Sequence, residues 1–408
     1  MPAYFDLKPG SLVLLPDSGR ELLRRELAFA LEELGFRVRR VMPDRLLDSA
    51  SPDFLLRVLD EGPALFFSVN LQGLLPGGRV PETLRQAGVP VLAWFVDNPW
   101  HVLSGMRDPS WKRWQLAVTD DSFVVPLRSA GAGGVLHLPL AACPRSLFAD
   151  KRPATGEEAI RGLFFAGRAS FPGRDTFFAG QSVPPELLEE AGAMSRRGER
   201  ADFHWWVRKL DLADEVPHFW PGKKARRPGL GAALSNRIWR AERLAAAAPL
   251  GVTLHGDADW GAELGQILVG QDGGQNDGQG IRLHPPFDYY ARAHELYRRA
   301  EFSLNLNSLM LVGGLTQRIF DIWAAGGFCL TGNSPGLDLF PDELTGPVTF
   351  SRPEELPELM ERFRAAPARK RELAEAWRGH ILGEHTYVRR LQGLLCGKTN
   401  PGWTKPPE

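Results

Sequence analysis

Residues 296–340 read LYRRAEFSLNLNSLMLVGGLTQRIFDIWAAGGFCLTGNSPGLDLF, and they contain one complete strand–helix–strand unit. The short apolar run at 302–306 predicts a buried strand, and a glycine-containing loop follows it. Residues 316–325 (TQRIFDIWAA) have apolar side chains at helical spacing and end at two glycines, which predicts a helix. The apolar run at 328–331 then predicts a second strand. A strand–helix–strand unit of this kind favours a parallel sheet.

The same alternation extends over most of the 408 residues. In the first part of the chain, apolar runs predict strands at 11–17, 36–42, 64–70, 89–96, 115–120 and 135–140. In the second part, they predict strands at 162–167, 252–256, 282–285, 302–306, 328–331 and 348–350. The predicted fold class is therefore α/β, with two Rossmann-like, doubly wound domains facing a cleft.

The domain boundaries follow from where this pattern lapses. We expect an N-terminal domain at 1–150, because the stretch around 143–156 is irregular and predicts a linker. A second domain is expected at 151–384, with a helical insertion at about 184–249. Residues 385–408 are expected to form a crossover helix and a tail. The glycine-rich segment GQDGGQNDGQG at 270–280 predicts a flexible loop.

Composition excludes several classes of protein. The 49 basic and 49 acidic residues give a formal net charge of zero, which argues against a dedicated nucleic-acid binder or a polybasic membrane anchor. No apolar run approaches the length of a membrane span, and the N-terminus has no signal-peptide pattern. The three cysteines are too widely spaced for a zinc site or a disulfide framework. These features predict a cytoplasmic protein.

Candidate ligand-binding residues surround the loop in the first stretch quoted. Asn307 follows the strand, Thr316 ends the Gly-Gly-Leu-Thr turn, and the next helix carries Gln317, Arg318 and Asp321. Backbone N–H groups at a helix N-terminus bind anions, and Arg318 adds charge-assisted bonds, so a diphosphate fits here. A carboxylate one turn further on accepts both hydroxyls of a ribose. The alternative is an Arg–Asp pair on a surface helix.

Several pieces of the sequence resemble CgeB-like proteins related to glycosyltransferase family 1. They are LYRRAEFSLNLNS, TQRIFDIWAAGGFCLT and LDLF in the stretch above, and EHTYVRRLQGLL at 384–395. VPVLAWFVDNPW at 89–100 resembles an N-terminal domain of unknown function that often accompanies them. The resemblance implies a GT-B fold and transfer of a sugar from a nucleotide-diphosphate donor. It implies a donor domain at 151–384 and an acceptor-side domain at 1–150.

The resemblance also implies roles for individual residues. Asp321 occupies the position of a carboxylate that binds the donor ribose, and Arg318 lies on the donor side. Arg168 is expected to reach phosphate, with Arg174 as the alternative. Related retaining enzymes carry a glutamate where this chain has Gly313, so retention of configuration is not implied. UDP is the default nucleotide. No histidine spacing typical of a metal site is present, so we expect metal-independent transfer with no cofactor beyond the nucleotide-sugar.

A general base on the acceptor side is expected to be a carboxylate. Asp97, in the VDNPW turn, is the first candidate, with an N-cap or Asx-turn role as the alternative. Asp17, after the first strand, is the second candidate, with an N-cap role as the alternative. His385, Tyr387 and Arg390 are expected to fasten the crossover helix to the first domain rather than to act in catalysis.

Three questions stay open at the level of sequence. The acceptor is a glycan, a lipid-linked molecule or a protein. The basic, Trp-rich stretch at 195–243 favours tryptophans packed inward, and a peripheral membrane contact is the less favoured interpretation. A nucleotide-sugar epimerase on the same fold, or a non-catalytic binding or scaffold protein, is the alternative to a glycosyltransferase.

Overall fold

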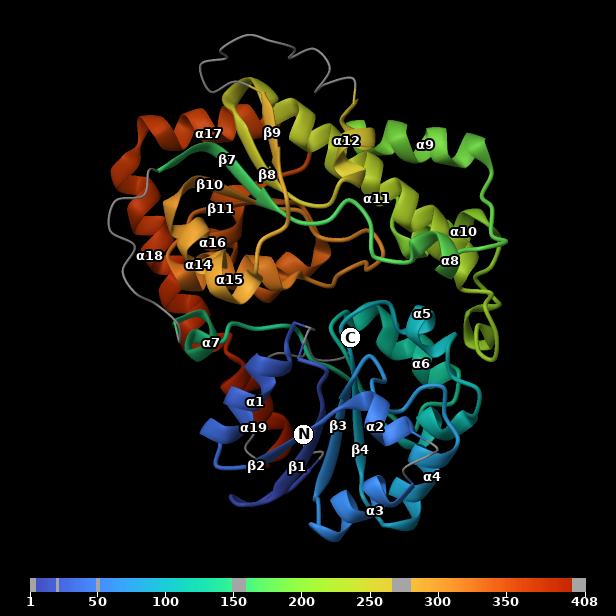
Figure 1. Ribbon diagram of the computed structural model, residues 1–408. Helices are drawn as coiled ribbons and strands as arrows, with labels where there is room; N and C mark the ends of the chain where they lie inside the picture. The colour runs from blue at the N-terminus through green and yellow to red at the C-terminus, as the bar shows by residue number, and fades with distance from the viewer. Residues whose placement is uncertain (1–4, 20–21, 49–51, 149–158, 266–279, 398–408) are drawn as a thin grey trace. The chain divides into compact units, whose positions relative to one another are not determined.

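A computed structural model describes residues 5–19, 22–48, 52–148, 159–265 and 280–397 (Figure 1). The chain divides into two compact units. Unit 1 comprises Met1–Ser146, Asp214–Ala225 and His385–Glu408. Unit 2 comprises Leu147–Ala213 and Arg226–Glu384.

Unit 1 contains a parallel sheet of six strands in the order β2-β1-β3-β4-β5-β6. The strands are β1 (Leu12–Pro16), β2 (Arg37–Val41), β3 (Leu65–Val69), β4 (Val91–Phe95), β5 (Gln115–Val118) and β6 (Gly134–His137). The helices are α1 (Arg24–Glu33), α2 (Pro43–Leu47), α3 (Pro52–Asp60), α4 (Arg79–Gln86), α5 (Pro99–Leu103), α6 (Val124–Ser129), α7 (Pro144–Phe148) and α19 (Tyr387–Leu395). Helices α1 and α19 lie side by side (Figure 1).

Unit 2 contains a second parallel sheet of six strands, in the order β12-β11-β10-β7-β8-β9. The strands are β7 (Ile160–Ala166), β8 (Val252–His255), β9 (Ile281–His284), β10 (Ala300–Asn305), β11 (Cys329–Gly332) and β12 (Thr349–Phe350). The helices are α8 (Arg174–Phe177), α9 (Pro185–Arg196), α10 (Phe203–Lys209), α11 (Arg226–Ala247), α12 (Asp259–Glu263), α14 (Tyr289–Arg299), α15 (Gln317–Ala325), α16 (Asp342–Thr345), α17 (Glu355–Ala365) and α18 (Pro367–Glu384).

Each sheet has one point at which the strand order reverses. In unit 1 this point lies between β1 and β3, and in unit 2 it lies between β7 and β10. Helices that leave neighbouring strands in opposite directions open a crevice at such a point, outside the carboxyl ends of the strands, and ligands bind there. The order in unit 2 is that of the Rossmann fold. The topology therefore directs attention to the residues that follow β7 and β10.

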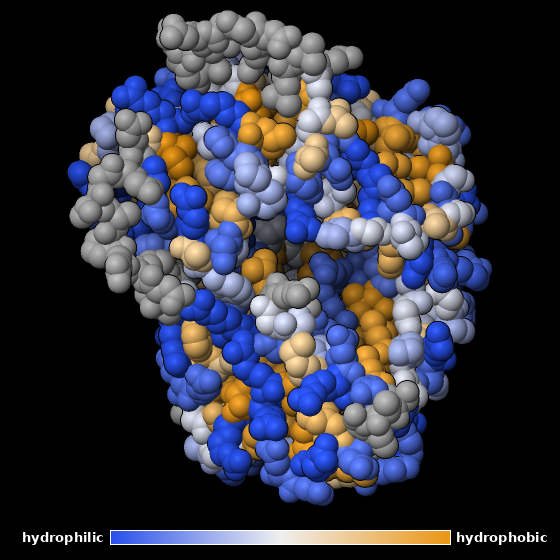
Figure 2. All heavy atoms as spheres, in the orientation of Figure 1, coloured by the Kyte–Doolittle hydropathy of each residue, from blue (hydrophilic) through white to orange (hydrophobic). Residues whose placement is uncertain are grey.

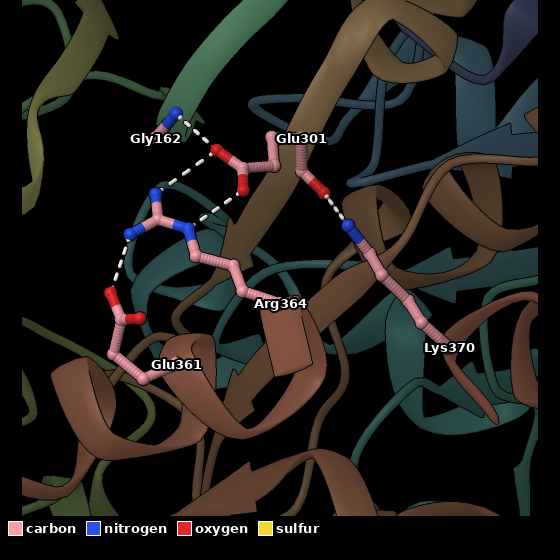
Figure 3. A network of polar contacts seen from close by, with 5 residues as sticks. All are labelled: Gly162, Glu301, Glu361, Arg364 and Lys370. Carbon is pink, nitrogen blue, oxygen red and sulfur yellow. Dashed lines mark hydrogen bonds and ion pairs between the residues drawn. The ribbon is translucent and has the colours of Figure 1, made fainter. Parts of the chain in front are cut away.

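A network of charged residues ties together the amino ends of the same two strands (Figure 3). The Glu301 carboxylate on β10 accepts hydrogen bonds from both Nε and Nη2 of Arg364, at 2.7 and 3.0 Å, and from the backbone N–H of Gly162 on β7 at 2.7 Å. Lys370 donates to the backbone carbonyl of Glu301. These contacts fix β7 against β10 at the end opposite to the crevice.

The predicted strands are all present among the described residues, each within two or three residues of its expected ends. The buried apolar runs explain this agreement: β3 and β4 are buried along their whole length because helices cover both faces of a doubly wound sheet. Helix α1 ends before Gly35, whose φ of +84° favours glycine. Most of the predicted linker, the glycine-rich loop and the tail lie outside the described residues.

The helical insertion differs from the expectation in one respect. Residues Asp214–Ala225 belong to unit 1, although we expected the whole insertion in the second domain. The reason is aromatic packing: Trp220 lies edge-on to Trp111 and donates its indole N–H to the carbonyl of Met106 at 3.0 Å. In unit 2, the tryptophans of the insertion are buried as expected. They are Trp205, Trp206 and Trp239.

The described helices include none that is long and apolar enough to cross a membrane. On the face drawn in Figure 2, hydrophilic side chains cover most of the surface and apolar ones lie in smaller separate areas. Among the exposed large apolar residues, Leu56 is 52% and Val125 is 69% exposed, and both lie on helices of unit 1.

Candidate functional site

A buried hydrogen-bond network lies at the carboxyl end of β10. The Asn305 amide donates to Asn307 Oδ1 at 3.2 Å and to the Thr331 hydroxyl at 3.1 Å, and its own Oδ1 accepts from the Thr316 hydroxyl at 2.6 Å. Asn307 Oδ1 also accepts from the backbone N–H of Thr316 at 3.1 Å. The network holds the loop before α15 against the end of the strand. Asn307 Nδ2 is buried and has no hydrogen-bond partner among the described residues.

Asp321 lies one turn into α15 and is 2% exposed. Its Oδ1 accepts from Gln317 Nε2 at 2.9 Å and its Oδ2 accepts from the Tyr289 hydroxyl at 2.7 Å. Burial, and then the charge of Asp321, raise the pKa of Tyr289, so this hydroxyl keeps its proton. Both carboxylate oxygens therefore have donors, and Gln317, rather than Asp321, is the more accessible of the pair.

Arg318 extends from α15 to the end of β7. Its guanidinium packs over the ring of Phe165, 4.7 Å from the centroid, and lies beside Gly167, which leaves room for it by having no side chain. Arg318 Nη1 is buried without a hydrogen-bond partner in the described part of the chain. Arg318 and Asp321 do not form an ion pair, although they are three residues apart on one helix.

Arg240, on α11, was not predicted as a site residue. Its Nη1 donates to the carbonyl of Arg168 at 3.1 Å and its Nη2 donates to the carbonyl of Leu306 at 3.4 Å. These carbonyls follow β7 and β10, so Arg240 bridges the two loops of the crevice. The sequence signal was a row of arginines three apart, at 237, 240 and 243, within a stretch that we considered only as generally basic.

The two guanidiniums give the crevice its electrostatic character. Burial, and then the proximity of Arg318, lower the pKa of Arg240 to about 9, and it stays protonated at neutral pH. Among the described residues, neither arginine forms an ion pair with a carboxylate. A half-buried pair of like charges is costly unless an anion neutralises it. The arrangement suits a ligand that carries two negative charges.

The two arginines predicted at the phosphate differ in position. Arg168 directly follows Gly167, and its side chain is exposed. Arg174, the alternative, lies on α8 and pairs with Asp175 at 2.8 Å. The structure thus brings Arg168, Arg318, Thr316 and Asn307 to the carboxyl ends of β7 and β10.

In unit 1, Asp97 follows β4 and is exposed. Its Oδ2 accepts from Asn70 Nδ2 at 2.7 Å. Asp97 does not cap α5, because Asn98 is the N-cap residue and accepts from the backbone N–H of Trp100 at 3.0 Å. Of the two structural alternatives that we considered for Asp97, an N-cap or an Asx-turn role, the N-cap role is therefore wrong.

Asp17 has a different environment. It is 5% exposed, its Oδ1 accepts from the backbone N–H of Gly19 at 2.7 Å, and its Oδ2 forms an ion pair with Arg40 at 2.6 Å. It does not cap α1, whose N-cap position is Leu23. Both oxygens of Asp17 therefore already have partners, and the side chain is shielded from an acceptor hydroxyl.

The last helix belongs to unit 1, as expected for a crossover. His385 accepts through its carbonyl from the N–H of Ala142 at 2.8 Å, and Tyr387 packs edge-on to Trp94. Arg390 is buried and donates to Nδ1 of His385 at 2.8 Å. These contacts support a fastening role. In unit 2, Gly326 ends α15 with a φ of +82°.

Part of this chain matches a known protein family. Residues 237–396, which include Arg240, Asn307, Arg318 and Asp321, match a family model described as glycosyl transferase-like. No curated protein matches the sequence.

Solved structures match over nearly the whole chain at low sequence identity. A structure of the DNA-modifying enzyme β-glucosyltransferase is 8% identical, covers 94% of this chain and 95% of its own, and has a TM-score of 0.50. T4 phage BGT in complex with UDP-glucose is 9% identical, covers 94% and 96%, and also has a TM-score of 0.50. A UDP-forming trehalose-phosphate synthase from Burkholderia xenovorans is 12% identical, covers 92% and 98%, and has a TM-score of 0.46. The α/β fold with two parallel six-stranded sheets is that of GT-B glycosyltransferase structures.

Proposed function

We propose that this protein is a glycosyltransferase that moves a sugar from a nucleotide-diphosphate donor to an acceptor hydroxyl. The observation that carries the proposal is the pair of guanidiniums, Arg240 and Arg318, at the strand-order reversal of unit 2. They are the kind of groups that bind a diphosphate, and they lie where ligands of this fold bind. The glycosyl transferase-like match over 237–396 supports the same reading.

The donor would bind with its diphosphate between the loops that follow β7 and β10. Arg318 and Arg240 neutralise the charge that develops on the leaving diphosphate, which takes over the role of a metal ion. The Nδ2 group of Asn307, which has no partner among the described residues, adds a donor, and Arg168 reaches the phosphate from the solvent side. Gln317, oriented by Asp321, accepts and donates at the ribose hydroxyls.

In the reaction, the acceptor oxygen bonds to the anomeric carbon, and the bond between that carbon and the diphosphate oxygen breaks. The hydroxyl proton passes to Asp97, which is the better general base of the two candidates because Asp17 is paired with Arg40. UDP is the default nucleotide, and the complex of T4 phage BGT with UDP-glucose supports that choice.

The proposal extends to the subfamily and the cellular location of the protein. We assign the chain to the CgeB-like group, on the RIFDIWAAGG and EHTYVRR segments, with residues 1–150 as the acceptor-side domain. We also propose a cytoplasmic location, because the three cysteines are too widely spaced for a disulfide framework. The acceptor is a glycan, a lipid-linked molecule or a protein.

The test is thermal unfolding of the full chain with millimolar UDP, GDP, dTDP or CMP, each in the presence of EDTA. A ligand at 100 times its dissociation constant stabilises the protein by about 2.7 kcal/mol, which corresponds to a rise in melting temperature of about 5–11 °C for a domain of this size. We expect one nucleotide diphosphate to produce this shift. Arg240→Gln and Arg318→Gln are expected to abolish it.

Arg196→Gln is the matched control, because Arg196 is an exposed arginine of the same unit, with its side chain 64% accessible. It should leave the shift unchanged. No shift with any nucleotide contradicts the proposal and favours a non-catalytic protein. Release of UDP from UDP-glucose separates the remaining classes: a transferase needs an acceptor, whereas an epimerase forms a sugar isomer without one.

A further inference from the structure

Two consecutive residues of unit 1 have a left-handed backbone although neither is glycine. Asn70 has a φ of +49° and Leu71 a φ of +57°, directly after β3. Asparagine tolerates this conformation, but leucine rarely adopts it. Strained residues of this kind are found where the surrounding structure holds them, often at functional sites. Here Leu71 is fully buried, which holds the turn in place.

The turn directs the Asn70 side chain to the end of the neighbouring strand β4. Asn70 Oδ1 accepts from the backbone N–H of Val96 at 3.0 Å and from that of Asp97 at 3.4 Å. Asn70 Nδ2 donates to Asp97 Oδ2 at 2.7 Å. One amide therefore holds both the backbone and the carboxylate of Asp97. Because Val69 on β3 pairs with Trp94 on β4, the contact spans two adjacent carboxyl ends of the sheet.

This contact leaves the two oxygens of Asp97 in different states. Oδ2 is fixed by the amide, whereas Oδ1 has no hydrogen-bond partner among the described residues, and the side chain is exposed. The neighbouring cap of α5 is supplied by Asn98, so Asp97 is not needed for the helix. A general base requires this combination: a fixed orientation and one oxygen open to the proton.

We propose that Asn70 is a positioning residue that orients Asp97 toward the acceptor hydroxyl. The inference rests on the proposed function, in which Asp97 accepts the hydroxyl proton. Asn70 acts through Asp97 and does not itself touch the reacting atoms. It stabilises the ionised carboxylate through Oδ2, and Oδ1 receives the proton as the acceptor oxygen bonds to the sugar.

The same turn places the charged group that acts on Asp97. Gln72 Oε1 accepts from Nε and Nη2 of Arg24, at 3.0 and 2.9 Å, and the carbonyl of Val69 accepts from Nη2 at 3.2 Å. Arg24 is buried at the start of α1. Loss of water around the carboxylate raises the pKa of Asp97, and the Asn70 amide and then the charge of Arg24 oppose this shift. The residues that follow β3 thus hold a carboxylate on one side and a guanidinium on the other.

The test is a direct titration of Asp97 in the full chain, by carboxyl NMR after ¹³C labelling of aspartate, with Asp97→Asn to assign the signal. Asn70→Gly deletes the amide but permits the left-handed backbone. Asn70→Asp keeps the size and backbone preference but replaces the donor with a second carboxylate. Asn98→Ser is the control, since serine also caps a helix and leaves the Asn70 contact intact.

We expect Asn70→Asp to raise the proton affinity of Asp97 about tenfold or more, because two adjacent carboxylates cannot both ionise readily. Asn70→Gly should raise it less, and Asn98→Ser should leave it unchanged. Unaltered titration of Asp97 in both Asn70 variants would overturn the inference, even if they were less stable, because a purely structural residue would behave in that way.

Release of UDP from UDP-glucose, with water as acceptor, tests the link to the reaction. Asn70→Gly is expected to lower kcat about tenfold and to leave KM for UDP-glucose unchanged, because the donor binds in unit 2. Asn70→Asp should also move the acidic limb of the kcat profile to higher pH. If Asp97→Asn keeps the wild-type rate, the base assignment fails and the positioning role falls with it, while nucleotide binding still tests the proposed function separately.

Discussion

Replacing Gly167 by alanine is expected to weaken the binding of a nucleotide diphosphate without unfolding unit 2. A Cβ atom at this position would lie 2.8 Å from Arg318 Nη2, and 3.1 and 3.2 Å from two ring atoms of Phe165. Ordinary contact begins at 3.4 Å, so the guanidinium must move by about 3.4 − 2.8 = 0.6 Å and the ring by 0.2–0.3 Å. The guanidinium is the far end of a flexible side chain, so the fold can accommodate this movement.

The displacement exceeds the range of donor–acceptor distances that a hydrogen bond tolerates, which is about 0.5 Å wide. A hydrogen bond to a charged group contributes about 1.5–3 kcal/mol. Its loss raises the dissociation constant for UDP roughly 10- to 150-fold. In the absence of nucleotide, the free energy of unfolding of Gly167→Ala should differ from that of the wild type by less than about 1 kcal/mol.

The assay is isothermal titration calorimetry with UDP at fixed ionic strength. Gly261→Ala, on α12, is the matched control, because a Cβ there meets nothing within 4 Å. It should bind UDP like the wild type, and Arg318→Gln should bind at least as weakly as Gly167→Ala. Wild-type affinity in Gly167→Ala together with a large loss in Arg318→Gln would refute the argument that Gly167 sets the position of Arg318. Wild-type affinity in both would remove Arg318 from the site.

Three further changes test stability. Acidification below about pH 6.5 is expected to lower the free energy of unfolding, because burial lowers the pKa of three histidines in the folded protein. The unfolded chain therefore binds more protons than the folded chain as the pH falls from about 6.5 toward the folded pKa values. Urea unfolding at pH 5.5 and 7.5 measures this loss of stability. The histidines are His137, His255 and His380. Glu301→Ala should lower the free energy of unfolding by about 1.5–3 kcal/mol, because Arg364 loses its main acceptor. Glu361 is exposed, so Glu361→Ala should lower it by at most about 1 kcal/mol. Equal effects of the two substitutions in urea unfolding would contradict the network in Figure 3. Gly231→Ala should lower the free energy of unfolding by about 1–3 kcal/mol, since the added Cβ would overlap the Trp206 ring. An unchanged melting temperature would show that the packing of α10 on α11 is looser than described.

Residues close in sequence were predicted well for a local reason. The strand β10, the turn before α15 and the glycines after it are encoded by neighbouring residues, so Asn307, Thr316 and Arg318 were expected at one edge of the sheet, and they lie there. The partners of Asp321 were not predicted. Gln317 is one turn away on the same helix, but Tyr289 comes from α14, and only the packing of the two helices brings its hydroxyl to the carboxylate.

The two aspartates of unit 1 show the limit of local reasoning. Both follow a strand of the same sheet and both precede a helix, so the sequence alone gave little reason to prefer one over the other as the general base. Pairing of β1 with β2 places Arg40 beside Asp17, whereas pairing of β3 with β4 places a neutral amide, Asn70, beside Asp97. The difference in chemistry is a consequence of strand order.

By itself, the sequence determined where the strands lie to within a few residues, that both sheets are parallel, and which loop of the second half holds Asn307, Thr316 and Arg318, because apolar periodicity and glycine positions act over a few residues. Tertiary structure alone decided that Arg240 joins Arg318. Their positions are 78 residues apart in the sequence, and only the strand order β10-β7 brings the loops after those strands together for one guanidinium to bridge. Long-range contacts of this kind depend on the order of strands, which no local pattern encodes.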